Sequence, residues 1–318
     1  MKIFLAGATG AVGRCLVPLL VAEGHEVTGT TRSTGKVGQL EAVGARGVVM
    51  DGLDPEGVTA AVTAAEPEVV IHQLTGLSGG VNPRRIDRDF ELTNRLRTEG
   101  TDSLLRAARQ SGVRRFVAQS YTGWPYAREG GPVKTEEDAL DPHPPAKLRP
   151  LLVAIRHLED AVTQAEGIEG LVLRYGAFYG PGTSITPGGE HWELVTKRRF
   201  PIVGDGGGVW SLVHIDDAAS AALAAAERGA SGLYNVTDDE PAPVSDWVPA
   251  LAEAAGAKPP RRVPAWLGRL GGGEAGLVML TESRGASNEK AKRELGWSPR
   301  HPTWREGFRE LGDAASPG

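Results

Sequence analysis

The chain has 318 residues, of which 40% are hydrophobic and 24% are charged, a composition typical of a globular protein with a sizeable core. Its net charge of −5 argues against a nucleic-acid partner, and no apolar run approaches the roughly 20 residues of a membrane span. One cysteine cannot form an internal disulfide, and the N-terminus lacks a signal-peptide pattern. We therefore expect a cytoplasmic protein with no nucleic-acid or membrane partner.

The first residues predict a strand, a glycine-rich turn and a helix. The apolar residues Ile3–Leu5 form the strand, and Ala11–Ala22 form the helix. Between them, glycines recur every three residues. At such a turn, free backbone N–H groups and the positive helix end attract an anion, and glycine lets the backbone approach a pyrophosphate. The sequence predicts a dinucleotide site that contains Gly7, Thr9, Gly10, Ala11, Val12 and Gly13.

Strands and helices alternate over the first 175 residues, which predicts a parallel sheet with helices on both faces. The further strands are expected at Glu26–Thr31, Gly47–Met50, Val69–His72, Arg115–Ala118 and Gly170–Arg174. Helices are expected at Val37–Val43 and Glu56–Ala65, and a long polar helix from about Asp87 to Gln110.

The second half is rich in glycine and proline, which predicts long loops. Its expected elements are the helices Asp216–Arg228 and Ser245–Ala255, the strand Gly232–Val236 and the basic, proline-rich segment Lys258–Pro264. The predicted fold class is α/β: a Rossmann-type doubly wound parallel sheet with a smaller, loop-rich C-terminal substrate-binding cap. We assign residues 1–175 to the dinucleotide-binding domain, with 209–235 returning to it, and 176–208 and 236–318 to the cap.

The end of the second strand bears on the choice of cofactor. An acidic residue there would hold the ribose hydroxyl of NAD, whereas an arginine can hold the 2′-phosphate of NADP. The sequence has Thr31 followed by Arg32, which favours NADP(H) over NAD(H). The ends of the third and fourth strands add the candidate cofactor-binding residues Asp51, Gly52, Leu74 and Thr75.

Several motifs in order resemble the extended branch of the short-chain dehydrogenase/reductase superfamily, the NAD-dependent epimerase/dehydratase family. They are Gly7-x-x-Gly10-x-x-Gly13, Val70-Ile71-His72-Gln73, Gly100-Thr101-Asp102-Ser103-Leu104-Leu105, Arg115-Phe116-Val117-Ala118-Gln119-Ser120, Leu173-Arg174-Tyr175-Gly176-Ala177-Phe178-Tyr179-Gly180-Pro181-Gly182, Val213-His214-Ile215-Asp216-Asp217-Ala218 and Leu295-Gly296-Trp297-Ser298-Pro299. These matches are specific for the fold but less so for the reaction, because this scaffold hosts many chemistries.

The resemblance implies further site residues. A serine or threonine after the fifth strand should polarise the substrate oxygen, and Ser120 matches it, with Thr122 as the alternative. Tyr175 and Phe178 become candidate cofactor-binding residues. An asparagine near the start of the long helix is expected too, but the nearest one, Asn94, lies six residues before Gly100, about three too many and close to one extra turn.

The Tyr-x-x-x-Lys pair that the resemblance implies is missing. If Glu159 aligns with the acidic residue that follows the lysine by four, Leu151 and Ile155 occupy the two positions, and neither can move a proton. Tyr126 is the replacement acid that we favour, although it could merely wall the pocket. Tyr121, Lys134, Lys147 and His157 are also nearby in the sequence.

The expected substrate is small and apolar or aromatic. Where enzymes that act on nucleotide sugars carry an arginine after a glycine-rich loop, this chain has Trp210 and Ser211. Aromatic side chains suit an apolar ring. The candidate substrate-binding residues are Trp124, Tyr126, Phe178, Trp192 and Trp210.

Our leading hypothesis is an NAD(P)-dependent oxidoreductase that acts on a small carbonyl or alcohol substrate. An epimerase or dehydratase and a non-catalytic NADP-binding sensor are the alternatives. We expect no metal: His214 and Asp216–Asp217 are more typical of a helix start, with Asp216 as its cap. The protein is expected to be a monomer or a homodimer.

Overall fold

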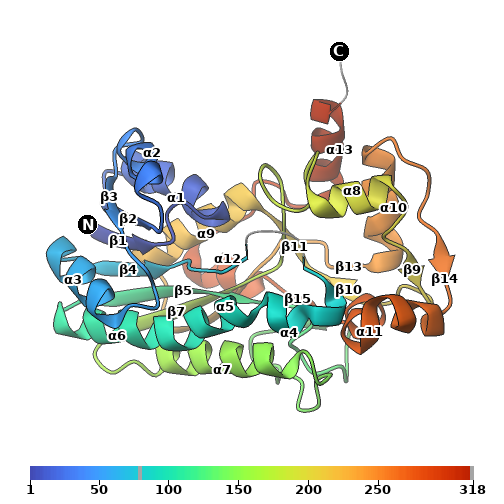
Figure 1. The fold of residues 1–318 in the computed structure, drawn as a ribbon, viewed down its shortest axis with the longest axis horizontal. Coiled ribbons are helices and arrows are strands. Elements are labelled where there is room, and N and C mark those ends of the chain that lie inside the picture. Colours follow the sequence, from blue (N-terminus) through green and yellow to red (C-terminus); the bar gives the residue numbers. More distant parts are fainter. Residues whose placement is uncertain (78–80, 316–318) are drawn as a thin grey trace.

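The computed structural model describes residues 1–77 and 81–315. Within these ranges, seven parallel strands form one sheet in the order β12-β7-β5-β4-β1-β2-β3 (Figure 1). Their bounds are β1 Lys2–Ala6, β2 Glu26–Thr31, β3 Arg46–Val49, β4 Val69–His72, β5 Arg115–Tyr121, β7 Glu169–Tyr175 and β12 Gly232–Val236. The predicted doubly wound parallel sheet is confirmed, and its strands begin or end within three residues of the predicted bounds.

Helices cover both faces of the sheet (Figure 1). On one face, apolar residues of β1, β4 and β7 pack against α1 (Ala11–Ala22), α9 (Ile215–Glu227) and α12 (Glu289–Leu295). On the other face, the alternate residues of the same strands pack against α3 (Pro55–Ala65), α6 (Thr101–Gln110) and α7 (Arg149–Thr163). Burial on both faces explains why the central strands β1 and β4 read as nearly continuous apolar runs.

The long polar helix predicted from Asp87 to Gln110 is interrupted. It consists of α4 (Ile86–Asp89), α5 (Glu91–Arg95), a π-helical turn over Leu96–Gly100 and α6. A π-helical turn holds one residue more than an α-helical turn and is frequent at functional sites. The six-residue spacing from Asn94 to Gly100 therefore includes this irregular turn, and is not explained by one extra turn of regular α-helix.

The C-terminal part contains more regular structure than the sequence indicated. Its helices are α8 (Glu190–Thr196), α10 (Val244–Ala254), α11 (Ala265–Thr281) and α13 (Trp304–Ala315). Short strands pair into small two-stranded sheets outside the main sheet. They are β6 Val133–Lys134, β8 Ala177–Tyr179, β9 Ile202–Val203, β10 Val209–Trp210, β11 Leu212–His214, β13 Ala242–Pro243, β14 Arg262–Val263 and β15 Gly285–Ala286. Apolar residues of α8, α10 and α13 form a core of their own beside the sheet (Figure 1).

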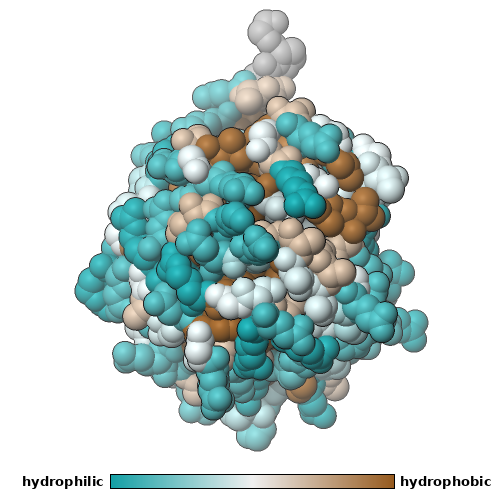
Figure 2. Space-filling model, turned by 90° about the vertical axis from the view of Figure 1, so that its left-hand side faces the viewer, coloured by the Kyte–Doolittle hydropathy of each residue, from teal (hydrophilic) through white to brown (hydrophobic). Residues whose placement is uncertain are grey.

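Hydrophilic residues cover most of the face shown in Figure 2, and hydrophobic residues appear there in scattered groups. This is the side on which α3 and β3 lie in Figure 1. Among the residues that the structure describes, no helix combines the length and apolar character needed to cross a membrane.

Candidate active site

The glycine-rich turn lies between β1 and α1 and is built to approach a ligand closely. Gly7 has a φ of +93°, and a Cβ there would lie 2.8 Å from the Gln73 carbonyl oxygen. A Cβ on Gly13 would lie 2.3 Å from the Gly7 carbonyl oxygen. Helix α1 begins at the exposed Ala11 without a side-chain cap, so its first N–H groups remain available for an anion. The turn therefore fits the pyrophosphate of a dinucleotide.

The end of β2 supports this turn. The Gly7 N–H donates to the Thr30 Oγ1 atom at 3.0 Å, and the hydroxyl groups of Thr9 and Thr31 lie 3.3 Å apart. Arg32 follows on the surface and pairs with no acidic residue that the structure describes. Thr9, Thr31 and Arg32 are thus brought beside the glycine turn.

The other candidate cofactor-binding residues are spread along the carboxyl edge of the sheet. A Cβ on Gly52 would meet the Leu74 side chain at 2.5 Å, so these two residues are in contact, and Thr75 follows Leu74. The exposed Asp51 accepts a hydrogen bond from the Leu53 N–H at 3.0 Å.

Three further candidates lie deeper. The Asn94 side-chain oxygen is buried and accepts no hydrogen bond from any described residue. Tyr175 is 1% exposed and donates to the Ala218 carbonyl oxygen at 3.2 Å. Phe178 is half-buried, with its ring 5.4 Å from that of Tyr175.

Three neighbouring strands place polar side chains in one row. Ser120 of β5 is in register with Arg174 of β7, which is in register with Asn235 of β12. Residues in register on parallel strands face the same side of a sheet, here the side of α7. Glu159 of α7 meets this row and accepts hydrogen bonds from the Ser120 hydroxyl and from the Arg174 Nε, both at 2.8 Å.

The Arg174–Glu159 pair is bidentate and buried. A second bond joins the Arg174 Nη2 to the other Glu159 oxygen at 2.5 Å, and the two residues are 3% and 4% exposed. Burial alone would lower the pKa of Arg174, but the hydrogen bonds and the charge of Glu159 outweigh it and raise that pKa. The Arg174 guanidinium therefore stays charged, and its bidentate bond to Glu159 fixes the acceptor of the Ser120 hydroxyl.

Tyr126 belongs to the same network. Its hydroxyl donates to the Asn235 Oδ1 at 2.8 Å and accepts from the Arg174 Nη1 at 3.1 Å. Burial raises the pKa of Tyr126, although Arg174 opposes this, so the phenol is protonated at neutral pH. The Thr122 hydroxyl is buried beside Tyr126 and acts to lower the pKa of Tyr126 as a side-chain hydrogen-bond donor.

The apolar replacements on α7 pack as the sequence indicated. Leu151, Ile155 and Glu159 follow one another at intervals of four on its buried face. Leu151 and Ile155 are at most 1% exposed and share an apolar cluster with Trp124 and, at its edge, Tyr121. Neither Leu151 nor Ile155 can exchange a proton.

One residue of this site escaped the sequence analysis. Arg97 lies in the π-helical turn, three residues before Gly100, where the expected spacing would place the asparagine. It is 7% exposed, and its charge acts on Glu159 and Tyr121. The expected spacing of three residues before Gly100 marks the position of Arg97, but the sequence prediction looked for an asparagine and chose Asn94.

The predicted aromatic substrate-binding residues do not form one group. Trp192 is 6% exposed within the C-terminal core, where the half-buried Trp210 packs and donates from its Nε1 to the Met279 carbonyl oxygen at 2.8 Å. Phe178 packs against the sheet core instead. Trp124 lies 6.4 Å from Tyr121, ring centre to ring centre.

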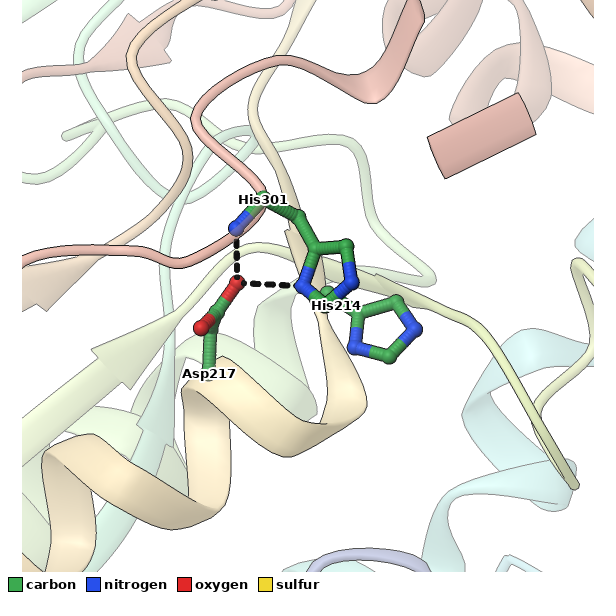
Figure 3. Close-up of side chains that lie close together, drawn as sticks. All are labelled: His214, Asp217 and His301. Atoms are coloured by element: carbon green, nitrogen blue, oxygen red, sulfur yellow. Dashed lines mark hydrogen bonds and ion pairs between the residues drawn. The ribbon is translucent and has the colours of Figure 1, made fainter. Parts of the chain in front are cut away.

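A second polar cluster lies at the start of α9, where His214, Asp217 and His301 meet (Figure 3). Asp217 accepts from the backbone N–H groups of Arg300 and His301 and lies 3.0 Å from the His301 Nδ1. The expectation that Asp216 caps this helix is wrong, because the His214 side chain accepts from the Asp216 N–H. This cluster ties the 300–301 segment to α9.

The comparisons with known proteins agree with this architecture. The profile of the NAD dependent epimerase/dehydratase family matches residues 3–237. A 3-diazoavenalumate denitrifying reductase of a Streptomyces species is 44% identical, over 97% of this chain and 99% of that protein. A 2-alkyl-3-oxoalkanoate reductase of Stenotrophomonas maltophilia is 28% identical, over 81% of this chain and 76% of that protein.

Solved structures show the same fold. The UDP-glucose 4-epimerase of Thermus thermophilus in complex with NAD aligns with a TM-score of 0.72 and 26% identity, covering 98% of both chains. That of Thermotoga maritima aligns with a TM-score of 0.76 and 24% identity, again over 98% of both chains. With the glycine turn and the sheet order, these matches show that the chain belongs to the NAD-dependent epimerase/dehydratase family and is an NAD(P)-dependent enzyme.

Proposed function

We propose that the protein is an NADPH-dependent reductase of a small electrophilic substrate. The observation that carries this proposal is the apolar face of α7, where Leu151 and Ile155 leave no acid/base pair for the repeated proton transfers of an epimerase or dehydratase. The 44% identity to a protein named as a reductase supports it. When bound, the reduced nicotinamide supplies the hydride.

The chain's own residues would bind and polarise the substrate. We infer that the Thr122 hydroxyl, which is buried beside the Tyr126 hydroxyl, turns to donate to the substrate oxygen. Ser120 would take part by exchanging its Glu159 acceptor for that oxygen. Tyr126 would deliver a proton directly or through an ordered water, which requires it to leave Asn235. Residues 176–208 and 236–318 would form the cap over the substrate.

Selectivity for NADPH is expected to depend on Arg32. Its exposed guanidinium follows Thr31 beside the glycine turn, where it can bind the 2′-phosphate. Replacing Arg32 with alanine should weaken NADPH binding about tenfold to a hundredfold and leave NADH binding unchanged. A fluorescence titration with both nucleotides measures this, with Arg46→Ala, at the amino end of the neighbouring strand β3, as the control. Equal weakening for NADH would contradict the assignment.

The reaction type is tested by following the absorbance of the reduced nicotinamide. With NADPH and a panel of carbonyl substrates, we expect a substrate-dependent loss of absorbance in stoichiometric amounts. An epimerase would instead form product with no net change in the cofactor. Tight NADPH binding without turnover of any substrate would favour the alternative hypothesis of a non-catalytic NADP-binding sensor.

A further inference from the structure

Arg97 is a largely buried cation that makes no hydrogen bond or ion pair with any residue that the structure describes. Two arginines are buried more deeply than Arg97, at 5% and 3% exposed, and both have partners. Arg115 donates to Glu169 and to three backbone carbonyl groups, and Arg174 donates to Glu159 and Tyr126. Arg97 is 7% exposed, yet it donates to no residue among positions 1–77 and 81–315. None of its nitrogen atoms is among the fully buried side-chain atoms that lack a partner, so the guanidinium still reaches solvent and is accessible to an external anion.

The protein's own carboxylate cannot fill this role. Glu159 is the one carboxylate whose charge acts on Arg97 among the described residues, and both of its oxygens are already bonded to Arg174. One of them also accepts from Ser120. Burial lowers the pKa of Arg97 to about 10, so it remains a cation at neutral pH. The five N–H donors of Arg97 therefore have no acceptor among the described residues.

The residues around Arg97 indicate which kind of ligand would fit beside it. The half-buried Tyr121 lies close enough for the Arg97 charge to act on it, and its hydroxyl also donates to no described residue. Trp124 lies beside Tyr121, and the apolar cluster that includes Leu151 and Ile155 continues from there. A planar cation, a phenol and an apolar wall suit a carboxylate attached to an apolar or aromatic body.

We propose that Arg97, together with the Tyr121 hydroxyl, binds the carboxylate of the substrate, so that the enzyme acts on small carboxylate-bearing molecules. This inference rests on the proposed reductase function and specifies its substrate class. The anion is that of the substrate rather than a cofactor phosphate, because the phosphate-binding turn follows β1. In the sheet, β5 and β1 are separated by β4, a distance of about 10 Å.

The test compares acids with their neutral amides. We would titrate the protein, saturated with NADP⁺, with 3-phenylpropanoate and benzoate and with the corresponding amides, and follow the arginine Nε–H signals by NMR. We expect each acid to bind at least about tenfold more tightly than its amide and to shift one Nε–H signal, which is missing in Arg97→Met. In Arg97→Met the preference for the acid should disappear, and in Arg97→Lys it should be reduced.

Two measurements separate this role from a structural one. The melting temperature of Arg97→Met should be unchanged or higher, since the change removes no hydrogen bond to a described residue, and its affinity for NADPH should stay within twofold of wild type. Arg95→Met, two residues away on the surface, should match wild type throughout. Equal binding of acids and amides, binding of neither, or a preference that survives in Arg97→Met would overturn the proposal. If the wild type binds NADPH but shows no preference for acids, the reductase proposal stands and the carboxylate proposal fails. If the wild type does not bind NADPH, both proposals fail.

Discussion

Replacing Gly13 with alanine should abolish nucleotide binding. The new Cβ would lie 2.3 Å from the Gly7 carbonyl oxygen and 2.6 Å from that of Ala8, and both are backbone atoms. The first turn of α1 would therefore have to move away from the glycine turn, which displaces the N–H groups that bind the phosphates. We expect NADPH affinity to fall at least about a hundredfold, the equivalent of about 3 kcal/mol.

The matched control is Gly38→Ala in α2 (Val37–Glu41). A Cβ there meets nothing within 4 Å, and alanine favours a helix over glycine by about 1 kcal/mol. Nucleotide titration of both variants, with circular dichroism to verify folding, measures the difference. If a folded Gly13→Ala protein binds NADPH like wild type, the glycine turn is not the nucleotide site.

The strands and the glycine turn were predictable because their signals are local. A run such as Val69–His72 is apolar whichever helix covers it, and the turn at Gly7 needs glycine for reasons within a few residues. The prediction of β5 ended at Ala118, three residues early, because Gln119 and Ser120 are polar. Their burial depends on partners such as Glu159, which lies 39 residues further on.

The C-terminal helices gave weaker local signals. Helix α11 contains three consecutive glycines ending at Gly273, which has a φ of +70° and marks a kink, so its sequence resembles a loop. The π-helical turn was hidden for a different reason. Nothing in the composition of Leu96–Gly100 indicates an irregular turn, and α7, which this turn contacts, is distant in the sequence. Arg97 could not be placed in the site without that turn.

The buried pair of Arg174 and Glu159 gives the second large effect. Replacing Arg174 with methionine leaves the buried Glu159 carboxylate with the Ser120 hydroxyl as its one remaining side-chain hydrogen-bond donor among the described residues, and removing one partner of a buried ion pair costs about 3–5 kcal/mol. We expect a loss of that size in the free energy of unfolding, measured by chemical denaturation. Arg95→Met breaks the exposed Arg95–Glu99 pair and should have no measurable effect.

The double variant Arg174→Met with Glu159→Leu distinguishes the charge effect from lost packing. If the single change is costly because it leaves a charge unpaired, removing both charges should restore a large part of the stability. The same double variant also removes the hydrogen-bond acceptor of Ser120 and the donor to Tyr126, so its activity should stay low although its fold recovers. If the losses of stability caused by Arg174→Met and Glu159→Leu instead add up in the double variant, the two side chains stabilise the protein by packing, because coupled charges cannot give independent effects.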